Sequence, residues 1–145
     1  MTRKTYVVAY EGDADGTRVL DYAISQAAQT GARLNIVHIL EWSPYRFLTK
    51  EEVEERHVRR SEELARASDA LMEPALEKAR AAGVEAIGTV KFGSVVPLVA
   101  ATVTDSGAEL VFVGRSGAHN FGARIFGSVP LGLAQIATVP TVIVP

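Results

Sequence analysis

The feature that most restricts the fold of this chain is an alternation between short apolar runs and longer segments with helical spacing. The runs are rich in valine and isoleucine, and most are continuous rather than alternating with polar residues. They are Thr5–Tyr10, Leu34–Leu40, Ala86–Val90, Leu110–Gly114 and Thr141–Val144. Continuous apolar runs of this length are typical of strands that are buried on both faces of a parallel sheet.

The segments between the runs carry apolar residues at intervals of three and four, which predicts helices with one buried side. They are expected from Val19 to Gly31, from Thr49 to Gly83, from Ser94 to about Asp105 and from Ser128 to near Ala137. Thr49 and Glu52 are spaced as a capping box, and Ser128 is predicted to cap the last helix. Pro74 is expected to kink the second segment or divide it in two.

Strands that alternate with helices imply an α/β fold, here an open five-stranded parallel sheet with helices on both faces. With 145 residues and no linker, residues 1–145 are expected to form a single domain. In such sheets, ligands bind beyond the carboxyl ends of the strands, where the strand order reverses. The stretch "GRSGAHNFGARIFGS", called the glycine loop below (Gly114–Ser128), begins at such an end.

Composition removes several classes of function. The formal net charge of −2 favours no nucleic-acid partner, and the absence of cysteine removes disulfides and thiolate metal sites. Three scattered histidines do not suggest a metal cage, so no metal site is predicted. No apolar stretch approaches the length of a membrane helix or a signal sequence, so we expect a cytoplasmic protein without membrane contact.

The glycine loop contains arginines and no carboxylate, and it leads from a strand end to a helix N-terminus. Exposed N–H groups and the helix dipole make such a place suitable for an anion, and glycine lets the backbone approach it. The alternative is an irregular surface loop that uses glycine only to turn, and the residues alone balance the two evenly. A Walker-type site is excluded, because Ser128 stands where that motif has lysine and G-x-G-x-x-G is absent.

The spacing G-x2-G-x9-G-[S/T], formed by Gly114, Gly117, Gly127 and Ser128, resembles the signature of ATP-binding universal stress proteins. The stretch "YVVAYEGDADGTRVLDYAISQAAQTGARLNIVHIL" resembles that family's first β-α-β unit. "GAELVFVGRSG" and "ATVPTVIVP" resemble its fourth and fifth strands. The resemblance spans nearly the whole chain and implies the adenine-nucleotide hydrolase-like, Rossmann-like superfold.

The resemblance also implies a set of nucleotide contacts. Main-chain amides and the hydroxyl group would hold the phosphates and ribose, Glu11 would lie near the nucleoside and Ile39 would pack the base. Arg115 is added from the loop sequence itself, because it could supply positive charge. The predicted set is Glu11, Ile39, Gly114, Arg115, Gly117, Gly127, Ser128 and Val129. Glu11 and Asp13 stand where the family usually has aspartate and serine. Ordinary turn and cap chemistry before the first helix is the alternative for both residues, and for Asp13 it is at least as good an explanation. His38 is expected to be structural rather than catalytic.

We therefore expect a stress-responsive regulatory protein that binds ATP, AMP or ADP. Mg²⁺ could accompany the nucleotide. No catalytic residue is predicted, and the chain is not expected to be an enzyme. A slow ATPase or nucleotidyl-transfer enzyme and a dimeric interaction module with a vestigial site are the alternatives. The apolar strand Thr141–Val144 is expected at a sheet edge, where it would form a homodimer, and a regulatory protein partner is also expected.

Two further segments have open interpretations. Trp42, Tyr45 and Phe47 follow a strand end, where they could cover a ligand or a partner, or could fold back into the core. The charge run "EEVEERHVRRSEE" is interpreted as a solvated helix face.

Overall fold

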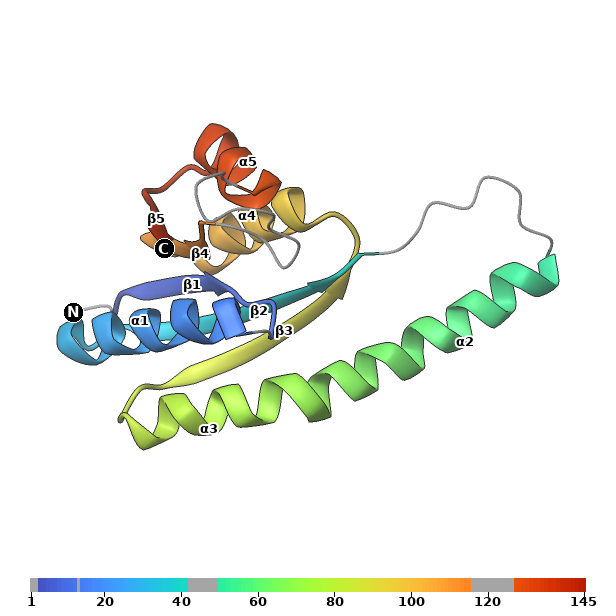
Figure 1. Ribbon diagram of the computed structural model, residues 1–145, viewed down its shortest axis with the longest axis horizontal. Helices are drawn as coiled ribbons and strands as arrows, with labels where there is room; N and C mark the ends of the chain where they lie inside the picture. Colours follow the sequence, from blue (N-terminus) through green and yellow to red (C-terminus); the bar gives the residue numbers. More distant parts are fainter. Residues whose placement is uncertain (1–2, 13, 42–49, 116–126) are drawn as a thin grey trace.

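A parallel β-sheet forms the centre of the molecule (Figure 1). The structure is a computed structural model that describes residues 3–12, 14–41, 50–115 and 127–145. Within these residues the sheet has five strands in the order β3-β2-β1-β4-β5, and every neighbouring pair is parallel. They are β1 Thr5–Ala9, β2 Arg33–Leu40, β3 Ala86–Phe92, β4 Leu110–Gly114 and β5 Thr141–Val144. This confirms the predicted fold class.

Helices cover both faces of the sheet, and each face has its own apolar core (Figure 1). Helices α1 (Ala14–Thr30) and α3 (Glu73–Ala81) lie on one face, and α4 (Val95–Ser106) and α5 (Ser128–Ile136) lie on the other. Val8 packs into the first core while its neighbour Val7 packs into the second, and neither has any exposed surface. Burial on both faces is the reason why the inner strands β1, β2 and β4 have continuous apolar runs, whereas the edge strand β3 has exposed residues.

The second helical segment is divided just before Pro74, as the sequence predicted. Helix α2 (Lys50–Ala67) runs into a single π turn, η1 (Ser68–Met72), and α3 begins at Glu73 with Pro74 in its first turn. Proline has no N–H and its ring collides with the carbonyl group one helical turn earlier, and the wider π turn accommodates both defects. Thr49 of the predicted capping box lies outside the described residues.

Two helix starts can be compared with the sequence-based expectation. Ser94 is the N-cap residue of α4, as predicted, and that helix ends at Gly107 in the left-handed conformation. The prediction that Ser128 caps α5 is wrong by one position. Gly127 is the N-cap residue, with the extended angles φ −68° and ψ 168°, and Ser128 is the first helical residue. An extended N-cap followed by helical geometry is the usual form of a helix start.

Helix α2 extends past the carboxyl ends of β2 and β3 (Figure 1). Glu51, Glu55, Arg59 and Glu62 are exposed on it, which confirms the solvated helix face expected for the charge run. The guanidinium group of Arg60 is an exception, because it lies 5.0 Å from the centre of the Phe92 ring. Among the helices that the structure describes, none is long and apolar enough to cross a membrane.

Candidate functional site

The reversal of strand order falls between β1 and β4. Strand β1 pairs with β2, which follows it in the chain, and also with β4, where Val8 lies opposite Phe112. Helix α1, which follows β1, and helix α5, which follows β4, lie on opposite faces of the sheet. The adjacent carboxyl ends of β1 and β4 are therefore the usual ligand position of an open α/β sheet. Glu11 follows the end of β1 and Gly114 is the last residue of β4, so two of the predicted site residues emerge here.

The two ends of the glycine loop are tied together at this position. The N–H of Gly127 donates to the carbonyl oxygen of Arg115 at 2.9 Å. The N–H of Arg115 in turn donates to the carbonyl oxygen of Val144, also at 2.9 Å. Arg115 thus joins the end of β4 to both β5 and the start of α5, and it places the N-terminus of α5 at the carboxyl edge of the sheet.

The first turn of α5 presents polar groups at this edge. Ser128 is exposed. Val129 is partly buried against the core of the α4 and α5 face, which anchors the turn. Pro130 has no N–H, so the first amide donors of the helix are those of Ser128 and Val129. These donors and the positive end of the helix dipole suit an anion.

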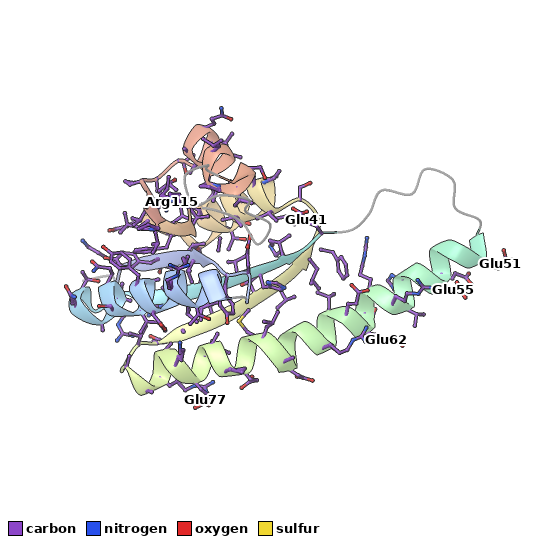
Figure 2. The ribbon with its side chains drawn as sticks, in the orientation of Figure 1. Glu41, Glu51, Glu55, Glu62, Glu77 and Arg115 are labelled. Atoms are coloured by element: carbon purple, nitrogen blue, oxygen red, sulfur yellow. The ribbon has the colours of Figure 1, made fainter. Side chains whose placement is uncertain are left out.

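The side chain of Arg115 is the cationic part of the site. Figure 2 shows it beside α5 at the end of β4. Its Nε atom is buried and has no hydrogen-bond partner among the described residues. A buried N–H donor without a partner is unfavourable by about 1–3 kcal/mol, and a phosphate oxygen would satisfy it.

The opposite side of the site, at β1 and β2, is acidic. Glu11 is exposed after β1, and Ile39 is partly buried near the end of β2. Glu41 follows β2 directly, is exposed, and lies at the carboxyl end of that strand in Figure 2. Glu41 was not singled out from the sequence, although its place directly after an apolar strand was a usable signal. The site therefore carries carboxylates on one side, and the Arg115 side chain and the N-terminus of α5 on the other.

His38 has a hydrogen-bond partner that the sequence did not reveal. Its Nδ1 atom lies 2.8 Å from the carbonyl oxygen of Tyr10, just past the end of β1, and the residue is only 9% exposed. The partner is a main-chain group on a neighbouring strand, which residue types alone do not identify. The contact agrees with the structural role expected for His38.

Comparison with known proteins assigns the family. The sequence model described as "Universal stress protein family" matches residues 2–145. The chain belongs to the universal stress protein family. No curated protein sequence matches this universal stress protein closely enough to count as a relative.

Solved structures of low sequence identity share the fold of this universal stress protein. The universal stress protein UspA from Lactobacillus plantarum is 16% identical, with a TM-score of 0.82 and full coverage of both chains. A universal stress protein solved in complex with cAMP is 23% identical, with a TM-score of 0.72 and coverage of 100% of this chain and 98% of that one. An Archaeoglobus fulgidus universal stress protein in complex with dAMP is 18% identical, with a TM-score of 0.63 and coverage of 99% and 98%.

Other predicted residues of this universal stress protein fall outside the described part of the chain. They are Asp13, Trp42, Tyr45, Phe47 and Gly117.

Across residues 3–12, 14–41, 50–115 and 127–145, no group of three or more histidine, aspartate or glutamate residues is arranged to hold a metal ion. The described part of the site thus brings Glu11, Ile39, Gly114, Arg115, Gly127, Ser128 and Val129 to the carboxyl edge of the sheet.

Proposed function

We propose that this universal stress protein binds ATP or a related adenine nucleotide, AMP or ADP, at the ends of β1 and β4. The observation that carries the proposal is the hydrogen bond between Gly127 and Arg115, which fixes the N-terminus of α5 beside the strand-order reversal. A helix N-terminus held at that edge is suited to phosphate. The protein would act in the cytoplasm as a stress-responsive regulator that engages a protein partner according to the bound nucleotide.

The distribution of charge supports one orientation of the nucleotide. Phosphate groups would lie against the amides of Ser128 and Val129 and beside the Arg115 guanidinium group, because these are the donors and the positive charge of the site. The ribose and base would lie toward Glu11 and Ile39. A carboxylate accepts hydrogen bonds from ribose hydroxyl groups and repels phosphate, so the reverse orientation is disfavoured.

Two relatives support the class of ligand. One universal stress protein of the same fold was solved with cAMP and another with dAMP. Both ligands join an adenine base to a phosphate group, which is the chemistry that the acidic and cationic sides of this site fit.

We propose binding without rapid turnover. Efficient phosphoryl transfer uses a metal clamp, stabilisation of charge on the γ-phosphoryl group and a positioned nucleophile. The described residues of the site supply amides, one arginine and the carboxylates of Glu11 and Glu41, which would serve to hold a nucleotide. Regulation would then depend on which nucleotide is bound.

We also propose a homodimer formed through β5. This strand is the last of the described sheet. The carbonyl oxygen of Pro140 accepts a hydrogen bond from Val111 of β4, and that of Val144 accepts one from Arg115, directly after β4. Because successive main-chain groups of a strand alternate in direction, those of Thr141 and Ile143 point away from β4. They are available to a second copy of the strand related by a two-fold axis.

The test is nucleotide binding by the purified protein. Mass spectrometry of gently purified material should detect ATP, ADP or AMP, and calorimetry on nucleotide-free protein should give saturable binding of ATP with one site per chain. Absence of co-purified nucleotide, together with no heat and no thermal shift on addition of ATP or AMP, would overturn the proposal in favour of an interaction module with a vestigial site.

A further inference from the structure

We propose that His38 is a positioning residue for the nucleotide site, which acts by fixing Glu11 through the main chain of Tyr10. The inference rests on the proposed function, because it assumes that Glu11 contacts a bound nucleotide. His38 itself lies within β2 and is buried, so it is not assigned a contact with the ligand.

Tyr10 is held by β2 at both of its main-chain polar groups. Its N–H donates to the carbonyl oxygen of Val37 at 2.8 Å, and its carbonyl oxygen is 2.8 Å from Nδ1 of His38. A carbonyl oxygen can only accept, so Nδ1 of His38 carries the hydrogen. The residue directly before Glu11 is therefore bound to two consecutive residues of the neighbouring strand.

The residue directly after Glu11 is restricted as well. Gly12 adopts φ +84°, a conformation that favours glycine. The side chain of Leu71, from the π turn η1, occupies the place that a Cβ atom on Gly12 would take. Leu71 and His38 thus restrain the two neighbours of Glu11 from different elements.

These restraints give His38 a role in binding. Glutamate has several rotatable bonds, and ordering an exposed side chain on binding opposes affinity. A fixed main chain limits this ordering to the side chain of Glu11. Loss of the His38 hydrogen bond would remove one restraint on the main chain directly before Glu11, so the effect on affinity should pass through Glu11.

The experiment measures the Kd for ATP by calorimetry in nucleotide-free wild type and in variants. His38→Ala should weaken binding about five-fold, the value of one ordinary hydrogen bond. His38→Asn, whose amide can donate from near the Nδ1 position, should restore most of the affinity. In a Glu11→Gln background, His38→Ala should have little further effect, because coupled residues are non-additive. The matched control is His57→Ala, an exposed histidine of α2.

The outcomes separate this inference from the proposed function. Wild type that does not bind ATP overturns the proposed function, and this inference with it. If the wild type binds ATP, two results would overturn the role of His38 alone. One is an unchanged Kd in His38→Ala, and the other is an equal loss of affinity when His38→Ala is introduced in the Glu11→Gln background. If His38→Ala does not fold, His38→Gln replaces it, since glutamine fills the space but carries its amide beyond the Nδ1 position, and the same weakening is expected.

Discussion

The N–H of Gly127 and the carbonyl oxygen of Arg115 are 2.9 Å apart, so the two ends of the glycine loop are hydrogen-bonded to each other. Arg115 is at the same time bonded to Val144 of β5. The main chain that holds the start of α5 is therefore part of the sheet itself. A side chain added at either end of the loop can therefore alter ligand binding at the N-terminus of α5, while the main-chain hydrogen bonds of Gly127 and Arg115 stay in place.

Gly127→Val should weaken ATP binding about ten- to a hundred-fold, which corresponds to the loss of one or two hydrogen bonds to a charged group. Gly127 has φ −68° and ψ 168°, which valine adopts without strain, and its N–H remains able to donate to Arg115. Calorimetry with ATP measures the loss, and thermal unfolding checks that the fold is kept.

The matched control for this change is Ala134→Val, which adds the same side chain at an exposed position farther along α5. It should leave the Kd for ATP unchanged. Equal affinities of the wild type and Gly127→Val would contradict the position assigned to the phosphates.

Gly12→Ala should destabilise the fold more than Gly31→Ala. Both glycines have positive φ, +84° and +74°, so each change costs about 1–2 kcal/mol of backbone strain. Only at Gly12 does the new Cβ atom meet Leu71, whereas Gly31 faces open space, and overpacking adds about 1–3 kcal/mol. Urea denaturation measures the difference, and a Leu71→Ala background should remove most of it. Equal losses of unfolding free energy in the two single variants would show that the Leu71 side chain moves aside at little cost.

Thr141→Pro should convert the proposed dimer to a monomer. The change removes an N–H that points away from β4, at the first residue of β5, where proline is tolerated. Light scattering should give twice the chain mass for the wild type and for Thr141→Val, which keeps the N–H, and the single mass for Thr141→Pro. A monomeric wild type at micromolar concentration would refute the assembly.

Incubation with ATP and Mg²⁺ should release phosphate far below the roughly 1–1,000 s⁻¹ typical of enzymes. Phosphate release measured in the wild type should equal that in Gly127→Val, which lacks an intact binding site. Release at catalytic rates that disappears in Gly127→Val would instead identify the chain as an ATPase.

The sequence predicted the sheet well because the inner strands β1, β2 and β4 are buried on both faces, so apolar runs such as Leu110–Gly114 mark them directly. It also predicted the division at Pro74, since proline acts locally. The placement of Ser128 as the cap of α5 was wrong by one position, because Gly127 and Ser128 are both acceptable cap residues.

Contacts between distant segments were not predictable from local patterns. The hydrogen bond from His38 to Tyr10 depends on the register of β1 against β2, and the contact of Leu71 with Gly12 depends on the π turn. Neither contact can be predicted from the spacing of residue types along the sequence. The candidate site residues at strand ends were found because topology, rather than side-chain detail, brings strand ends together.

The central position of β1 has a consequence for the order of assembly. The pairing of β1 with β2 and of β2 with β3 uses the first part of the chain, whereas the pairing of Val8 with Phe112 must wait until β4 has been synthesised. The strands β1 to β3 can therefore pair before β4 has been synthesised, whereas the proposed nucleotide site needs both halves of the sheet. Ligand would be captured only after both halves have joined, so it would favour the completed molecule over every partly folded form.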